Sequence, residues 1–234
     1  MATAHTPHPY YPLDLVLDHY VPNTYSMKDT LTLLFSTFGA ITIGSIALSY
    51  PKRHSTIKGL GNQLTFLWFV MCGFIHLFLE GYFSVHHATL AGDQHPLAQV
   101  WKEYSLSDSR YLSSDSFVLI MESITAFAWG PLAFFAAKTM YYNTPARHVA
   151  QLILSLGQIY GCVLYYLTTM VEGSPHCDPH PYYYYFYFAF FNIFWIVVPT
   201  ILMHNSVKNL YRASKAALAA ETAANAGAKA KKSK

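Results

Sequence analysis

The chain has 234 residues, of which 53% are hydrophobic, 17% aromatic and only 12% charged, and its formal net charge is +3. Soluble domains carry about 25% charged residues, so this composition excludes an ordinary soluble protein and indicates a membrane protein. The positive charge is concentrated at the C-terminus without any nucleic-acid-binding motif, so no nucleic-acid partner is expected.

Five apolar stretches are each long enough to cross about 30 Å of hydrocarbon as an α-helix. With their flanks they predict an all-α, polytopic membrane domain over residues 1–212, followed by a basic cytosolic tail over residues 213–234. The predicted spans cover about residues 30–50, 63–86, 115–141, 147–171 and 182–207.

Basic residues are distributed unevenly around these spans. Twelve of the fifteen lysines and arginines lie in the first and third connections or after the last span. Because Lys and Arg accumulate on the cytoplasmic side, we predict a lumenal N-terminus and a cytosolic C-terminus. Residues 1–27 have no signal-peptide pattern, so the first span is expected to direct insertion.

The end of the chain offers two interpretations. Its last four residues, KKSK, resemble the dilysine retrieval signal of endoplasmic reticulum membrane proteins. The alternative is a plain basic tail, helical near the membrane and disordered beyond it.

The second connection, about residues 87–114, is the longest. It mixes Trp101, Tyr104 and Tyr111 with polar residues. We expect this segment to cover a cavity from the lumenal side.

Three ionisable side chains lie well inside the predicted spans: His76 and Glu80 in the second and Glu122 in the third. A centrally placed charge costs roughly 2.5 to 3.5 kcal/mol, so such groups are expected to serve a function. His76 and Glu80 share one helix face because they are four residues apart.

Helix geometry also predicts the depths of these groups. At about 1.5 Å per residue, Glu80 and Glu122 each lie roughly 8 to 10 Å below the lumenal end of their span. His76, Thr125 and Asn192 lie roughly 14 to 15 Å below it. Spans two, three and five are therefore predicted to converge on one polar cavity.

Two carboxyl groups close together in a low dielectric cannot both ionise comfortably, so we expect a neutral acid beside a carboxylate. His76 can relay protons between them, and the indole of Trp195 or Trp129 can face a cation. The set suits reversible protonation of an apolar substrate through a carbocation. The alternative is interhelical glue, but such polar pairs contribute only about 0.6 kcal/mol.

Other patterns carry less chemistry. The loop HCDPHP has metal-capable residues, but its two prolines disfavour convergence, and no metal site is predicted. The sequence contains no phosphate-binding Gly-rich loop, Ser/His/Asp order or CxxC motif. Cys72 and Cys162 lie within spans, which leaves Cys177 alone in a lumenal loop.

Four stretches resemble the emopamil-binding-protein family, the sterol Δ8-Δ7 isomerases of the EXPERA group. They are GFIHLFLEGYF, WKEYSLSDSRY, MESITAFAWGPL and GQIYG. The resemblance runs from HPYYP near the N-terminus to the lysine-rich tail. It departs at Cys162, where some relatives carry Asp, and in LTTMVEG, which lacks an acid that some relatives have.

This resemblance implies a homodimeric endoplasmic reticulum enzyme whose five helices enclose a sterol pocket. The enzyme would move the ring double bond of a Δ8-sterol from C8 to C7 without a cofactor, and amphiphilic amines would inhibit it. The resemblance assigns proton transfer to His76, Glu80 and Glu122. It assigns cation stabilisation or substrate binding to Trp195, Asn192, Thr125, Trp101, Tyr104, Tyr111 and Met121.

Two other functions stay open. A non-catalytic sterol- or amine-binding receptor of the same family would bind ligand without shifting the double bond. A channel or proton-coupled carrier would need polar groups on both sides of the midplane, and no clear continuation of the path is predicted in spans one or four.

Overall fold

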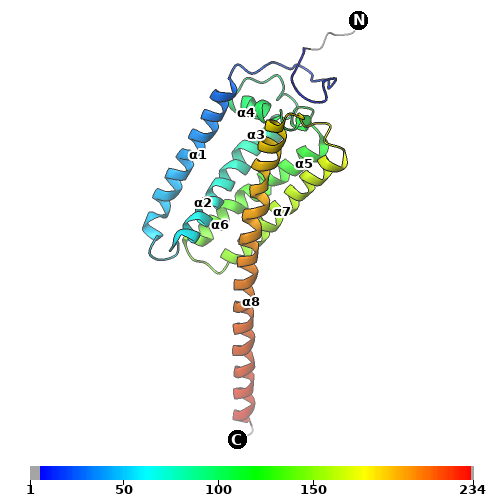
Figure 1. Ribbon diagram of the computed structural model, residues 1–234. Helices are drawn as coiled ribbons and strands as arrows, with labels where there is room; N and C mark the ends of the chain where they lie inside the picture. The colour runs from blue at the N-terminus through cyan, green and yellow to red at the C-terminus, as the bar shows by residue number, and fades with distance from the viewer. Residues whose placement is uncertain (1–5, 233–234) are drawn as a thin grey trace.

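The structure is a computed structural model that describes residues 6–232, apart from the side chains of residues 227 and 229–232. Every regular element in this range is helical, and five helices are long and apolar enough to cross a membrane (Figure 1). The predicted all-α polytopic fold is confirmed. The five spans are Met27–Lys52, Leu60–His86, Ser116–Tyr141, Arg147–Val171 and Tyr182–Ala226.

Several spans are built from more than one helix. Span one joins α1 (Met27–Ser49) to the short η1 (Tyr50–Lys52), and span four is the single helix α7 (Arg147–Val171). Span two consists of α2 (Leu60–Phe74), η2 (Ile75–Glu80) and α3 (Gly81–His86). Span three consists of α5 (Ser116–Ile124), η4 (Thr125–Trp129) and α6 (Gly130–Tyr141). Span five consists of η5 (Tyr182–Phe190) and the part of α8 (Phe191–Lys232) that reaches Ala226.

Three connecting segments gather at the end of the bundle that carries the N-terminus (Figure 1). They are residues 6–26, residues 87–115 with α4 (Pro96–Tyr104) and η3 (Ser109–Tyr111), and residues 172–181. Backbone hydrogen bonds tie them together, from Val21 to Ala91 at 2.9 Å and from Ser109 to His176 at 3.0 Å. We call these three segments the cap, and the opposite end of the bundle the tail end.

Side-chain caps fix where two spans begin. Ser26 and Asp29 form a reciprocal capping box at the start of α1. The Asp115 carboxylate accepts from the backbone N–H of Val118 at 2.9 Å at the start of α5. These contacts satisfy N–H groups that a helix terminus leaves free.

Spans two and three both contain a π-helical segment in mid-membrane, η2 and η4. Pro131 is the second residue after η4 and has no backbone N–H to donate one turn back, which disfavours regular α-helix before it. The two segments pack closely, because a Cβ added to Gly130 would lie 3.0 Å from the backbone nitrogen of Leu77. Such π segments are frequent at functional sites.

Small residues bring spans two, three and four together. A Cβ added to Gly73 would lie 2.7 Å from the ring of Phe134, and one added to Gly157 would lie 2.6 Å from the indole of Trp129. Small residues at helix interfaces let backbones approach closely, which is the main source of packing energy between helices in lipid.

The last helix differs from its sequence-based expectation. α8 continues without a break through Lys232, well beyond the bundle, where disorder was expected (Figure 1). Ala and Lys are strong helix formers, which accounts for the extension. Residues 231 and 232 of the KKSK sequence lie in this helix, and 233 and 234 lie outside the described residues.

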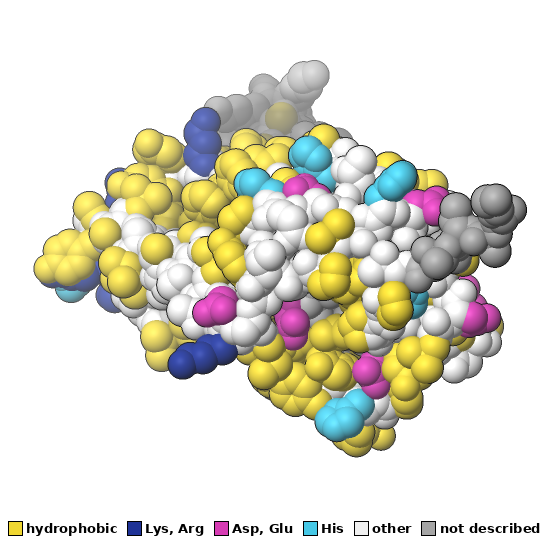
Figure 2. All heavy atoms as spheres, turned by 90° about the horizontal axis from the view of Figure 1, so that it is seen from above, with side chains coloured by type: hydrophobic (Ala, Val, Ile, Leu, Met, Phe, Trp, Pro, Cys, Tyr) yellow, Lys and Arg dark blue, Asp and Glu magenta, His cyan; other side chains and the backbone are white. Residues whose placement is uncertain are grey.

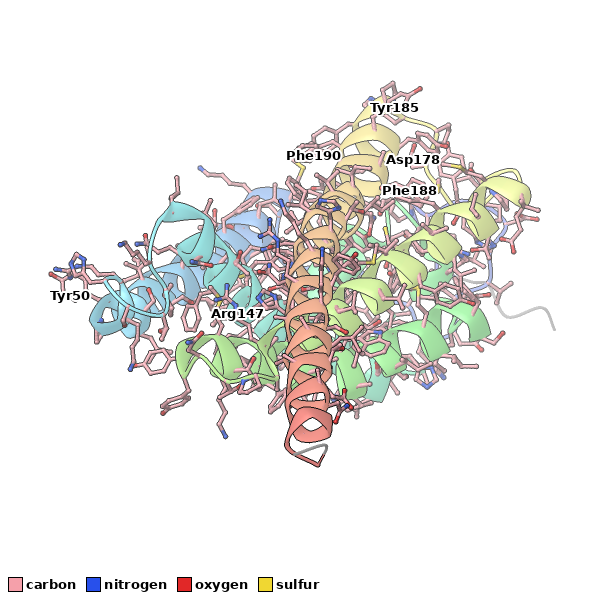
Figure 3. The ribbon with its side chains drawn as sticks, turned by 90° about the horizontal axis from the view of Figure 1, so that it is seen from below. Tyr50, Arg147, Asp178, Tyr185, Phe188 and Phe190 are labelled. Carbon is pink, nitrogen blue, oxygen red and sulfur yellow. The ribbon has the colours of Figure 1, made fainter. Side chains whose placement is uncertain are left out.

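The outer surface of the bundle is apolar. Tyr185 and Phe190 point outward from η5 and are 67% and 47% exposed, whereas Phe188 points into the bundle and is 1% exposed (Figure 3). Seen from the cap, acidic and histidine side chains gather on the end face and yellow apolar side chains border it (Figure 2). This distribution matches lipid around the spans and water over the cap.

The Gly73 contact provides a test of the packing. In Gly73→Ala the added methyl group collides with Phe134, and overpacking of this kind costs about 1–3 kcal/mol. We expect the melting temperature of the purified protein in detergent to fall by about 2–4 °C for each kcal/mol.

The matched control is Gly44→Ala in α1, where nothing lies within 4 Å of the added Cβ. It should leave the melting temperature unchanged or raise it, because Ala is the better helix former. Equal melting temperatures for the two variants would contradict the packing argument.

Candidate functional site

A cavity lies inside the bundle and is lined by residues of all five spans and of the cap. Nine of the ten predicted site residues line it: Glu80, Trp101, Tyr104, Tyr111, Met121, Glu122, Thr125, Asn192 and Trp195. Both carboxyl groups therefore face the same space, together with the aromatic cap residues. The remaining wall is mainly aliphatic and aromatic, including Leu31, Leu34 and Phe38 of α1.

His76 is the exception, since it lies behind the wall. Its side chain is fully buried and bridges two polar groups. Its Nδ1 lies 2.8 Å from the Glu80 carboxylate, and its Nε2 lies 3.0 Å from the side-chain nitrogen of Gln158 in α7. Glu80 therefore stands between the cavity and the imidazole, in a chain that leads from the cavity to span four.

Glu122 has a different partner. The Tyr111 hydroxyl reaches down from the cap and donates to Glu122 Oε1 at 2.5 Å. The Tyr111 ring stacks on Trp101 with centroids 4.8 Å apart, and Trp101 donates its indole N–H to the carbonyl of Leu79 at 2.9 Å. Leu79 belongs to the π segment η2, so the cap is fixed to the irregular backbone that carries Glu80.

Two further contacts fix the rest of the polar wall. Asn192 donates to the Tyr104 hydroxyl at 2.8 Å, which joins span five to the cap. Thr125 donates to the carbonyl of Met121 at 2.9 Å, so its hydroxyl is satisfied within its own helix. Thr125 can therefore shape the cavity without supplying a free hydroxyl proton.

The two tryptophans considered as cation-facing groups have different positions. Trp195 lines the cavity, and its ring centroid lies 6.1 Å from that of His76 and 5.6 Å from that of Trp68. Trp129 instead packs over Gly157 and belongs to a separate core cluster toward the tail end. Trp129 is therefore not among the residues that line the cavity, and its indole packs at the interface between spans three and four.

Sequence reasoning missed several polar residues of the site. Span four was expected to add no clear polar path, but Gln158 binds His76, so that expectation is wrong. The signal was available, since Gln158 lies between Gly157 and Gly161 in GQIYG and a GxxxG pattern marks a buried helix face.

A third carboxyl group, Glu103 of α4, also lines the cavity at the cap. It accepts from the Tyr187 hydroxyl at 3.1 Å. Burial raises the pKa of Glu103 above its usual range, against the opposing effect of that hydrogen bond. Nothing in the sequence pattern distinguishes Glu103 from exposed loop residues.

A buried ion pair holds the cap onto span four. The Arg110 guanidinium donates to both carboxylate oxygens of Asp108, at 2.7 Å for the shortest contact, and also to the Thr169 hydroxyl of α7. Both charged residues are at most 2% exposed. We call the Arg110–Asp108 pair with its Thr169 contact the clamp. Since Tyr111 follows Arg110 directly, the clamp also positions the phenol that binds Glu122.

Lys102 is a second buried cation in the cap. Its ammonium donates to the carbonyl of Val21 at 2.9 Å and so anchors the N-terminal segment over α4. Burial lowers the pKa of Lys102 to about 8, although the charge of Asp93 opposes the shift. The cap is thus held by polar contacts of Arg110 with span four and of Lys102 with the N-terminal segment.

These features define a polytopic membrane protein with a mainly apolar cavity inside its helix bundle. The cavity wall holds two carboxyl groups, one joined to an imidazole and one to a phenol. Such a wall can give up and accept protons beside a water-poor ligand. Among described residues, no group of three or more metal-capable side chains is close enough to hold a metal ion.

Comparison with known proteins identifies the family. Residues 96–206 match the family model described as EXPERA, the expanded EBP superfamily. A Cavia porcellus protein named 3-beta-hydroxysteroid-Delta(8),Delta(7)-isomerase is 44% identical over 92% of this chain and 95% of its own length. Proteins of the same name from Mus musculus and Rattus norvegicus are each 45% identical over 87% and 88% of this chain, and over 88% and 90% of their own lengths. The chain belongs to the EXPERA family.

The clamp allows a prediction for stability. Arg110→Met leaves the Asp108 carboxylate buried without its counter-ion, and breaking such a pair costs about 3–5 kcal/mol. We expect the melting temperature of the purified protein to fall sharply.

The double variant Arg110→Met/Asp108→Leu should recover most of that loss, because an apolar pair of similar volume removes the stranded charge. A double variant that is no more stable than Arg110→Met would show that the clamp does not act as an isolated ion pair.

Proposed function

We propose that this protein is a sterol Δ8-Δ7 isomerase of sterol biosynthesis. The observation that carries the proposal is the shared position of Glu80 and Glu122 on one apolar cavity wall, with His76 directly behind Glu80. The names of the mammalian relatives agree with it, since this chain covers 88% or more of each of their lengths.

The proposed reaction needs one proton donor and one proton acceptor. The donor acid protonates C9, and the C8–C9 π electrons form the new C9–H bond and leave a cation at C8. The C7–H bond then breaks, its electrons form the C7–C8 double bond, and its proton goes to the acceptor. Protons and electrons balance, so no redox cofactor is required.

The cavity wall provides both groups. Glu80 exchanges a proton with His76 through their 2.8 Å contact, and Glu122 holds its proton or its charge against the Tyr111 hydroxyl. Apolar residues of α1 and aromatic residues of the cap surround the ring system and exclude water, which strengthens electrostatic effects on the developing cation.

Trp195 is proposed to stabilise the cation. Its indole lines the cavity, and its ring centroid lies 6.1 Å from that of His76, the partner of Glu80. An indole face attracts a cation by about 0.5–2 kcal/mol, most strongly where water is excluded. The same property would favour an amphiphilic amine, whose ammonium group imitates the charge at C8.

We further propose that the protein resides in the endoplasmic reticulum membrane with a lumenal cap and a cytosolic tail. Support comes from the basic residues at the tail end, including Lys52 and Arg147, and from the position of the two termini at opposite ends (Figure 1). A homodimer, as the family resemblance suggests, is part of the same proposal.

The proposal is tested by converting the acids into amides. Purified Glu80→Gln and Glu122→Gln should each lose conversion of a Δ8-sterol to its Δ7 isomer by about 10²- to 10⁴-fold, because an amide cannot replace an acid-base group. Gas chromatography with mass spectrometry distinguishes the two isomers.

Glu221→Gln is the matched control, since Glu221 is exposed on the α8 extension, far from the cavity. It should convert sterol at the wild-type rate. A wild-type protein that binds the sterol without shifting its double bond would instead support the non-catalytic receptor.

The cation site has its own test. Trp195→Leu should weaken binding of an amphiphilic amine by up to about 2 kcal/mol more than binding of an uncharged sterol, because only the amine loses a cation–π contact. Competition against a radiolabelled ligand gives both affinities. An equal loss for both ligands would mean that Trp195 acts through shape alone.

A further inference from the structure

A row of buried polar side chains leads from His76 toward the tail end along the contact between α7 and α8. It comprises Gln151, Ser155 and Gln158 of α7 and Ser206 of α8, all at most 3% exposed. We call these four residues the polar seam. The cavity does not include Gln151, Ser155 or Ser206.

Two hydrogen bonds establish how the helices are aligned. The Gln151 side chain donates to the carbonyl of Leu202 at 2.8 Å, and the Cys162 thiol donates to the carbonyl of Asn192 at 3.3 Å. The helices run antiparallel, so the α7 residues between these points face the α8 residues between them. Ser155 and Gln158 follow Gln151 by four and seven residues and share its face.

Four side-chain oxygens of the seam lack hydrogen-bond partners among the described residues. Gln151 Oε1, Ser155 Oγ, Gln158 Oε1 and Ser206 Oγ are all buried without a hydrogen-bond partner in the protein. Buried polar atoms almost always have partners, and an unsatisfied one costs about 1–3 kcal/mol. Water is the partner that buried polar groups of this kind commonly hold.

A proline adds an acceptor to the same region. Pro199 is buried within α8 and has no N–H to give to the carbonyl of Trp195, one turn earlier. By the alignment above, Pro199 is level with Ser155. By the same alignment, the Trp195 carbonyl that Pro199 leaves without its helical N–H is level with Gln158.

An ionisable side chain, His148, lies on the same helix face at the tail end of the seam. His148 precedes Gln151 by three residues and Ser155 by seven, and so lies on the same face of α7. Its ring is partly exposed, while its Nδ1 is buried without a partner. From His148 to Gln158 the distance along the helix is about 15 Å.

We propose that the polar seam is a water-filled proton path that connects the His76–Glu80 pair with the solution at the tail end. This proposal rests on the isomerase function proposed above. Each turnover leaves the donor one proton short and the acceptor one proton over, so both must be reset. The seam exchanges protons between the His76–Glu80 pair and bulk water through His148 at its tail end. Glu122 exchanges its proton with that pair across the cavity once the product has left.

The geometry at the inner end suits this role. His76 binds Glu80 through Nδ1 and Gln158 through Nε2, so a proton taken up on one side of the ring can leave from the other. Gln158 holds its free Oε1 at the point where the seam begins. A water molecule can donate to that oxygen. When the Gln158 amide turns away from Nε2, this water accepts the proton from the imidazole and passes it toward Ser155.

Deuterium labelling tests the path. Purified full-length protein converts a Δ8-sterol in D₂O, and mass spectrometry measures the deuterium at C9 of the Δ7 product together with the rate. Wild-type protein should place solvent deuterium at C9. Ser155→Val fills the seam with an apolar side chain and should reduce turnover by roughly tenfold, equivalent to about 1.4 kcal/mol on the barrier.

The same variant should also retain more ordinary hydrogen at C9, because protons taken from C7 are returned inside the closed site. Gln151→Met, which keeps the side-chain length, is the second variant if Ser155→Val does not fold. Ser45→Val is the matched control, since Ser45 is a buried span-one serine whose hydroxyl already donates to the carbonyl of Ile41 at 2.7 Å. It should match wild type in both readouts.

Wild-type turnover and deuterium content in either seam variant would overturn the proton path, as would a wild-type product without deuterium at C9. Absence of any Δ7 product from wild-type protein would instead contradict the isomerase function itself. The two failures are thereby distinguishable.

Discussion

The structure depends on one constraint, which is that ionisable groups inside a membrane must find their partners within the protein. His76, Glu80 and Glu122 lie in spans whose outer faces meet hydrocarbon, and all three are at most 9% exposed. His76 and Glu80 bind each other, and His76 also binds Gln158 of span four. Glu122 binds Tyr111 of the cap. The bundle therefore cannot separate without stranding a charge, which links tertiary packing directly to the site.

The local irregularities of the helices follow from the same constraint. The π segments η2 and η4 face each other where the acids lie, and Gly130 lets their backbones come close. The cap is attached to the same backbone, because the Trp101 indole N–H donates to the carbonyl of Leu79 in η2. The π segments, the attachment of the cap and the placement of the acids are thus structurally linked.

The spans and the inward-facing acids were predictable because both follow from hydrophobicity and helical period. A rise of about 1.5 Å per residue was enough to predict that Glu80 and Glu122 face one cavity. The position of His76 behind Glu80 was not predictable, since α-helical geometry placed both side chains on one face and the π segment η2 was not apparent. Gln158 and Glu103 were missed because uncharged amides and loop acids are common, and only the tertiary contacts single them out.

The two acids differ in the kind of partner that holds them, and this difference bears on how the site can cycle. Tyr111 can donate to an ionised Glu122 or accept from a protonated one, so the phenol serves both states without changing its own charge. His76 instead can take the proton of Glu80 and carry it away. A reaction that is neutral in protons overall still needs one acid that stays in place and one that communicates with the outside. The phenol and the imidazole divide these tasks, and the polar seam lies behind the imidazole alone.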